Sequence, residues 1–243
     1  MQHPSELTAP PAVAHEIFGE RISGALGYAR LLATTGVDHG LIGPREVPRL
    51  WERHILNCAV LACVLEPDVV VGDIGSGAGL PGLAVAIARP DIRMHLIEPL
   101  ARRTVWLAAA VAELGLENVT VHRGRAESLA GVLRFDVVTA RAVARLALLA
   151  EWSAPLLTAG GELIALKGAT ASREIDEDEA AISAAGGVDA RVETLGADLL
   201  EVPTTIVRIT FPNERSAESG RGAGGRPRSG RRKRAGRGSS RRS

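Results

Sequence analysis

The run VVGDIGSGAGLPG at residues 70–82 constrains this chain more than any other feature of its sequence. Two valines begin an apolar strand, and the glycines that follow permit a sharp turn and a close approach of a ligand to the backbone. Pro81 suits the first turn of a helix. The segment therefore predicts a strand, a glycine-rich turn and a helix, the unit from which Rossmann-like sheets are built.

The rest of the chain extends this unit. Apolar residues recur at helical spacing over 12–34 and 46–65, which predicts a helical unit ahead of the turn. Beyond it, the expected strands lie at 94–97, 119–122, 135–139 and 162–166, and the expected helices at 102–114, 146–157 and 172–185. This alternation is typical of a parallel sheet with helices on both faces. Strands expected at 191–195 and 204–211 have no helix between them, which predicts a hairpin with one antiparallel strand.

We therefore expect an α/β, Rossmann-like fold with a mostly parallel seven-stranded sheet, an antiparallel C-terminal strand and added N-terminal helices. Residues 1–66 are expected to form the helical unit, 67–212 the sheet domain and 213–243 a basic tail.

The tail differs from the rest of the chain in charge. Residues 213–243 hold eleven Arg or Lys and two Glu, which leaves 18 of the 29 basic and 26 of the 28 acidic residues in 1–212. The tail has no aromatic residue and no aliphatic residue larger than Ala, so it has nothing to bury and is expected to be disordered. Its charge suits nucleic acid, with a merely solubilising role as the open alternative.

Composition also excludes several classes of protein. No run of eighteen apolar residues appears, which predicts no membrane span, and the first residues lack the features of a secretory signal. Cys58 and Cys63, the two cysteines, cannot form a disulfide framework or a four-ligand zinc site. We expect a soluble, cytoplasmic protein without a metal.

The glycine turn matches the Gly-x-Gly-x-x-Gly dinucleotide fingerprint at residues 77–82, but its charge favours another ligand. A pyrophosphate resting on the turn would meet the carboxylate of Asp73, two residues before Gly75. That acid suits a cationic ligand, namely the sulfonium and ammonium groups of S-adenosylmethionine. The pattern Asp-x-Gly-x-Gly-x-Gly, which includes Gly77, is typical of Rossmann-like methyltransferases.

Two further acids point to a nucleoside. Glu98 ends the second strand, where a carboxylate accepts hydrogen bonds from ribose hydroxyls. NAD enzymes share this device, so an NAD-dependent oxidoreductase remains an alternative. Ala126 and Glu127 follow the third strand and are expected beside the adenine, although Glu127 also fits a plain helix-start carboxylate.

Four segments carry a more specific resemblance: RHILN at 53–57, DIGSGAGLPG at 73–82, ARA at 140–142 and ALKG at 165–168. Together they are similar to the small-subunit ribosomal RNA methyltransferase G family, also called glucose-inhibited division protein B, over about residues 12–211. The resemblance implies a class I methyltransferase fold, with an S-adenosylmethionine-dependent domain over 67–212. The cofactor positions that it implies are Gly75, Leu80, Ala126, Glu127 and Arg141.

The same resemblance implies methyl transfer to N7 of one guanine in 16S ribosomal RNA near the decoding centre, with that RNA or the small ribosomal subunit as partner. N7 has a free lone pair in the ring plane, so we expect direct in-line displacement, no general base and no catalytic residue of that kind. An RNA-binding module without activity remains an alternative.

Arg141 and Lys167 end the fourth and fifth expected strands and are candidate RNA contacts. A salt bridge for Arg141 and an exposed surface position for Lys167 are the alternatives. His54 and Asn57 share one helical face, where a hydrogen bond between the helical unit and the sheet domain is expected, with a role in closing the cofactor or RNA site as the alternative. Asn57 stands where the family usually has Asp, and residues 39–42 stand where it usually has Asn-Leu-Thr. We expect these departures to affect RNA contacts and not cofactor binding.

Overall fold

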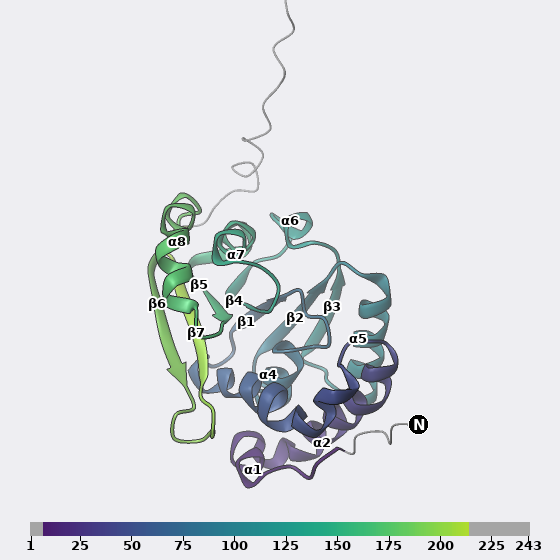
Figure 1. The fold of residues 1–243 in the computed structure, drawn as a ribbon. Coiled ribbons are helices and arrows are strands. Elements are labelled where there is room, and N and C mark those ends of the chain that lie inside the picture. Colours follow the sequence, from purple (N-terminus) through teal and green to yellow (C-terminus); the bar gives the residue numbers. More distant parts are fainter. Residues whose placement is uncertain (1–6, 214–243) are drawn as a thin grey trace, which may run out of the picture.

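Residues 7–213 are described by the computed structural model, and they form a seven-stranded sheet with helices on both faces (Figure 1). The strands are β1 (Val70–Ile74), β2 (Arg93–Glu98), β3 (Val119–Arg123), β4 (Phe135–Arg141), β5 (Leu157–Leu166), β6 (Val188–Leu195) and β7 (Thr204–Phe211). Their order is β3-β2-β1-β4-β5-β7-β6, and among them β7 alone runs antiparallel to its neighbours. The predicted mostly parallel sheet with an antiparallel C-terminal strand is confirmed.

Helices after the first strand alternate with the strands as expected. They are α4 (Gly82–Ala88), α5 (Ala101–Glu113), α6 (Ala126–Leu129), α7 (Leu146–Ser153), η6 (Ala154–Leu156) and α8 (Ala171–Ala184). α6 has a single turn, which is too short to give a periodic pattern in the sequence.

The helical region before β1 is more broken than its sequence predicted. It consists of α1 (Ala12–Phe18), η1 (Gly19–Arg21), α2 (Ile22–Leu31), η2 (Leu32–Gly36), η3 (Pro44–Arg49), η4 (Leu50–Ile55), α3 (Leu56–Ala59) and η5 (Val60–Val64). Thr34 and Thr35 donate their hydroxyls to carbonyls four residues back, where the chain widens into the π-helical turns of η2. Such bonds compete with the backbone ladder and distort a helix.

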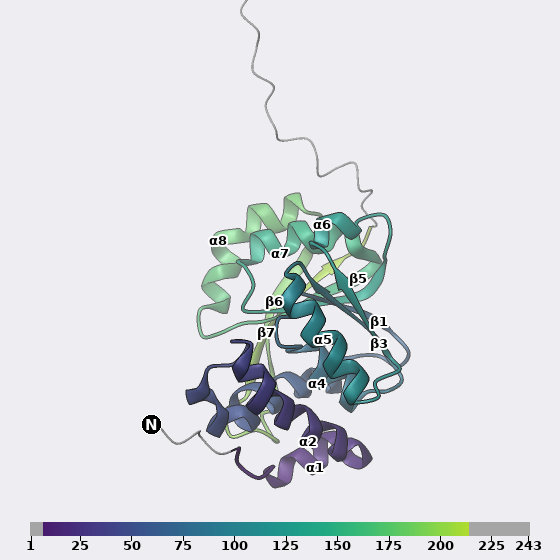
Figure 2. The same cartoon turned by 90° about the vertical axis from the view of Figure 1, so that its right-hand side faces the viewer.

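Two hydrophobic clusters sandwich the sheet. One joins the helices before β1 to α4, α5 and one face of the strands, and the other joins α7 and α8 to the opposite face. The two views show α1, α2 and α4 together on one side and α6, α7 and α8 on the other (Figure 2). The N-terminal helices therefore share a core with the sheet. Within residues 7–213 no helix is long and apolar enough to cross a membrane.

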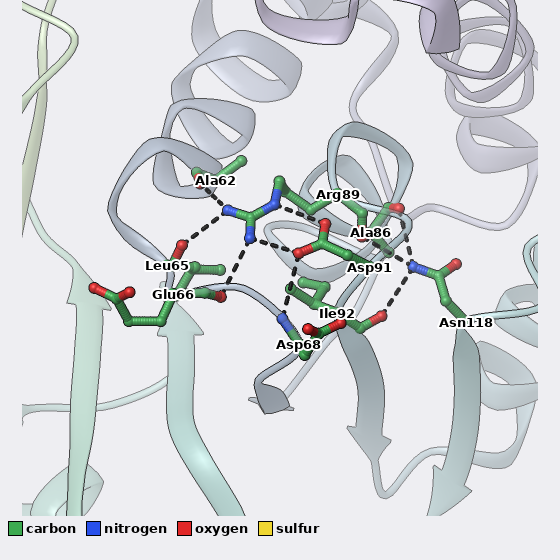
Figure 3. A network of polar contacts seen from close by, with 9 residues as sticks. All are labelled: Ala62, Leu65, Glu66, Asp68, Ala86, Arg89, Asp91, Ile92 and Asn118. Carbon is green, nitrogen blue, oxygen red and sulfur yellow. Dashed lines mark hydrogen bonds and ion pairs between the residues drawn. The ribbon is translucent and has the colours of Figure 1, made fainter.

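A polar network ties the amino ends of the strands to the helices (Figure 3). Arg89 pairs with Asp91 at 2.6 Å between Nη2 and Oδ2, and it also donates to the carbonyls of Ala62, Leu65 and Glu66. The Asn118 side-chain amide donates to the carbonyls of Ala86, Arg89 and Ile92 at 3.1–3.2 Å. At the amino ends of the strands, these side chains thus donate hydrogen bonds to carbonyls that the ends of helices leave without a partner.

Candidate active site

The glycine turn bends the chain from β1 over the end of β2. Gly75, Gly77 and Gly79 have φ values of 71°, 54° and 85°, in the left-handed region that side-chain-bearing residues avoid. The Gly75 amide donates to the Ile97 carbonyl at 2.8 Å. From the helical region, the buried Tyr28 hydroxyl donates to the Ala78 carbonyl at 2.8 Å. The turn is therefore held from both β2 and α2.

A cavity of about 580 Å³ opens beside this turn, at the carboxyl ends of β1, β2 and β4. Its lining includes seven residues that the sequence singled out: Gly75, Gly77, Leu80, Glu98, Ala126, Glu127 and Arg141. A Cβ at Gly75 would lie 2.6 Å from Cγ2 of Val143, so a side chain there would collide with the cavity wall. The volume is typical of small-molecule and cofactor sites.

Glu98 is the buried acid of this cavity, with a side chain only 2% exposed. Its Oε2 accepts from the Gly77 amide at 3.1 Å and its Oε1 from the Leu100 amide at 2.9 Å. Arg103 of α5 lies 3.6 Å from Oε2. Because each carboxylate oxygen has two lone pairs, both oxygens keep an acceptor site for a ligand hydroxyl.

Asp73 lies behind the turn and does not line the cavity. Its Oδ2 accepts from the Gly82 amide at 3.1 Å, while Oδ1 is buried without a hydrogen-bond partner among residues 7–213. Burial raises the pKa of Asp73 to about 7. The structure thus places this acid beneath the turn rather than in its opening.

Arg141 reaches from the end of β4 to the helical region. Nη1 donates to Cys58 Sγ at 3.2 Å, and Nη2 donates to the Arg53 carbonyl at 3.1 Å and to Nδ1 of His54 at 2.9 Å. The bond to His54 is a hydrogen bond between the helical unit and the sheet domain of the kind expected from the sequence, whereas its partner Arg141 and the bonds to Cys58 and Arg53 were not expected. The described residues place no acid within ion-pair distance of this guanidinium.

Lys167 lies at the end of β5 with a side chain 12% exposed. Its ammonium pairs with Glu174 of α8 at 2.7 Å and donates to the Ala144 carbonyl at 2.9 Å. Lys167 therefore connects the segment after β4 to α8. Its ammonium is paired with Glu174, and its side chain is not at the exposed surface position that the sequence left as an alternative.

A second cavity, of about 970 Å³, adjoins the first. His54, Arg141 and Ala142 line both cavities, and Asn57 and Lys167 line the second alone. The first cavity thus shares a wall with a larger space between the helical region and the ends of β4 and β5.

Several residues of the first cavity were not expected there from the sequence. Leu41 and Ile42, within the segment that departs from the family, line it together with Arg103 and Trp152. Two residues of the departing segment 39–42 therefore lie at this cavity, and the expectation that the departure affects RNA contacts and not cofactor binding stays a prediction. Packing of the N-terminal helices over the turn brings these two residues there.

Comparison with known proteins identifies the family. The model of the family described as rRNA small subunit methyltransferase G matches residues 21–202. The ribosomal RNA small subunit methyltransferase G of Corynebacterium efficiens is 53% identical over 206 residues, which cover 84% of this chain and 88% of the relative. That of Streptomyces avermitilis is 51% identical over 210 residues, covering 86% of this chain and 88% of the relative.

Among solved structures, M. jannaschii TYW2 in complex with AdoMet superposes with a TM-score of 0.52 at 17% identity, covering 67% of this chain and 77% of that one. At this identity the likeness shows the fold, in agreement with the class I methyltransferase architecture expected from the sequence. The sequence matches decide between the two enzyme classes, because the matched family is a methyltransferase and not an oxidoreductase. The chain belongs to the rRNA small subunit methyltransferase G family.

Proposed function

We propose that this methyltransferase transfers a methyl group from S-adenosylmethionine to N7 of one guanine in 16S ribosomal RNA near the decoding centre. Family membership supports the reaction class, and the resemblance of the sequence points to the guanine. The observation that carries the proposal is the shared wall of His54, Arg141 and Ala142 between two cavities. One cavity suits the cofactor, and the larger one beside it suits a nucleotide of the RNA.

The residues of the first cavity fit S-adenosylmethionine. Gly75 and Gly77 leave room at the turn where a Cβ would intrude or strain the backbone. Glu98 offers buried carboxylate oxygens to the ribose hydroxyls, and Ala126 and Glu127 follow β3 on the side proposed for adenine. Leu80 adds an apolar surface. Asp73 acts from beneath the turn, where its carboxylate form favours a cationic ligand nearby.

The reaction needs alignment more than proton transfer. S-adenosylmethionine, when bound, would supply a sulfonium methyl group. In-line transfer to the N7 lone pair would form the N–CH3 bond as the S–CH3 bond breaks, leave a neutral thioether and move the positive charge to the guanine ring, so no general base is needed. The chain's part is to bind both partners in line and exclude water, for which effective molarities of about 10⁵ M or more are attainable. No residue is therefore assigned as an acid or base.

Arg141 is also proposed to contact the RNA. Three of the five guanidinium N–H groups are used in its bonds to the helical region, which leaves two for a base or phosphate. Lys167, already paired with Glu174, is proposed to act on RNA by holding the rim of the second cavity and adding positive charge there.

The basic tail, predicted from residues 213–243, lies outside the described residues except for Asn213. We propose that its eleven basic side chains add affinity for the ribosomal RNA. The proposed setting is the cytoplasm, where the small subunit is assembled.

The proposal is tested by incubating 16S ribosomal RNA, and separately small subunits, with labelled S-adenosylmethionine and mapping the product by mass spectrometry. The expected product is N7-methylguanine at a single position. Gly77→Asp is the inactive control, because it places a second carboxylate beside Glu98 and strains the turn. Methylation at another atom, or none with either substrate, would overturn the proposal.

A further inference from the structure

A hydrogen-bonded chain of three side chains ends at the wall between the two cavities. Arg141 Nη2 lies 2.9 Å from Nδ1 of His54, and Nε2 of His54 lies 2.9 Å from Oε2 of Glu46. A guanidinium only donates and a carboxylate only accepts. His54 must therefore accept at Nδ1 and donate at Nε2, so its two neighbours select one neutral tautomer.

We propose that Glu46 and His54 are positioning residues that hold the Arg141 guanidinium in the wall between the cofactor and RNA cavities. This inference rests on the proposed function. Glu46 lines neither cavity, whereas His54 and Arg141 line both. Glu46 therefore acts on the site through His54, at 2.9 Å, and through a longer, exposed ion pair at 3.5 Å with Arg53, which lines the second cavity.

The hydrogen bonds of Arg141 restrict where its guanidinium can lie. Its other bonds go to Cys58 Sγ and the Arg53 carbonyl, which lie on the same helical segment as His54. The guanidinium is thus held on the helical side by three groups within six residues, while its own backbone belongs to β4. Loss of the His54 contact removes one of these three restraints, so the guanidinium is held less firmly in the wall by Cys58 Sγ and the Arg53 carbonyl alone.

The surroundings of His54 keep it neutral. Burial lowers the pKa of His54, Glu46 opposes this through its hydrogen bond and charge, and Arg141 and Arg53 add to the lowering. The net result is that the pKa of His54 lies below its ordinary value. Protonation at low pH would put an N–H at Nδ1 facing the Arg141 N–H, and the contact would be lost.

The first test does not depend on activity. In ¹⁵N-histidine-labelled protein, the signals assigned to His54 by their loss in His54→Asn should show a protonated Nε2 and an unprotonated Nδ1, and should titrate below free histidine. Glu46→Gln keeps the hydrogen-bond acceptor and removes the charge, so it should keep this tautomer and titrate lower still. A protonated Nδ1 at neutral pH would overturn the proposal even if the enzyme methylates RNA as expected.

The second test separates positioning from folding. Glu46→Ala should lower kcat roughly tenfold to a hundredfold, and Glu46→Gln should recover most of it. In both variants the acid limb of the pH–rate profile should move to lower pH, because the carboxylate no longer favours the imidazolium. Glu20→Ala, an exposed acid of the same helical region, is the control and should match the parent protein.

His54 itself offers a rescue pair. His54→Asn places an amide oxygen near the position of Nδ1, so it should retain the Arg141 contact and lose the acid limb, whereas His54→Ala should lose activity. Equal activities of the His54→Asn and His54→Ala variants would contradict the positioning role. An acid limb that stays unchanged in the Glu46 variants would contradict it as well. Absence of methyl transfer in the parent protein would instead count against the proposed function.

Discussion

The Oδ2 atom of Asp73 accepts a hydrogen bond from the amide of Gly82 at 3.1 Å, which closes the glycine turn from beneath. The carboxylate is fully buried, and its other oxygen has no partner among the described residues.

Asp73→Asn should stabilise the cofactor-free protein at neutral and alkaline pH. Burial raises the pKa of Asp73 from near 4 to about 7, so the folded state binds a proton that the unfolded state has released. The contribution of this group to the free energy of unfolding is fully present below pH 4 and is lost as the pH rises through 7. The difference in free energy of unfolding between the Asn variant and the parent should therefore grow between pH 4 and pH 7, to about 4 kcal/mol at most.

Thermal unfolding of both proteins between pH 4 and pH 9 measures this difference. A constant gap across the range would contradict it. The same pair tests the cofactor role, because the Asn variant should bind S-adenosylmethionine more weakly at pH 8 if the carboxylate favours its cationic groups.

Gly82→Ala should destabilise the fold. Its Cβ would lie 2.4 Å from Cδ2 of Leu96 and 2.7 Å from Oδ2 of Asp73, all in the buried interior. Overpacking of this kind costs about 1–3 kcal/mol. Urea unfolding measures it, with Gly168→Ala as the control because its Cβ meets nothing within 4 Å. Equal midpoints for the two variants would refute the clash.

Glu98→Gln should weaken cofactor binding about tenfold to a hundredfold. The amide can accept only one of the two backbone hydrogen bonds from Gly77 and Leu100, and it offers the ribose fewer acceptors. Glu127→Gln is the matched comparison and should have a smaller effect, because Glu127 is exposed at the start of α6. Calorimetric titration with S-adenosylmethionine checks both, and a larger loss for Glu127 would reverse the ranking.

Asn118→Ala should lower stability without altering methyl transfer, because this residue lies at the opposite edge of the sheet from the cavities. It removes two N–H donors that three carbonyls share, at about 1 kcal/mol for each donor. A fall in Tm of roughly 5–10 °C is expected. Asn118→Asp should be at least as harmful, since a carboxylate faces the same oxygens without a proton to donate. A decrease in kcat greater than the decrease in the fraction of folded protein would contradict this prediction.

Removal of residues 213–243 should weaken binding to 16S ribosomal RNA while methylation is retained. Each phosphate contact that the basic side chains make should add about one unit to the slope of log affinity against log salt. Binding measured between 50 and 300 mM salt compares the truncated and full chains. Identical slopes would show that the tail makes no RNA contact.

Local sequence patterns were enough to predict the strand–turn–helix unit, the alternation after it and the antiparallel strand near the C-terminus. They also brought Gly75, Gly77 and Glu98 together, and all three line the first cavity, because the carboxyl ends of neighbouring parallel strands meet at one edge of a sheet. These features depend on neighbours in the chain and on a simple topological rule.

The sequence did not reveal how segments far apart would meet. Arg141 binds His54 across 87 residues, and Leu41 and Ile42 reach a cavity built mainly by the sheet. The burial of Asp73 and the engagement of Lys167 by Glu174 were equally hidden. Partner choice and desolvation are set by packing of whole elements, so the sequence by itself determined the turn and its acids, whereas the tertiary structure decided which of them face the cavity and what holds the wall beside them.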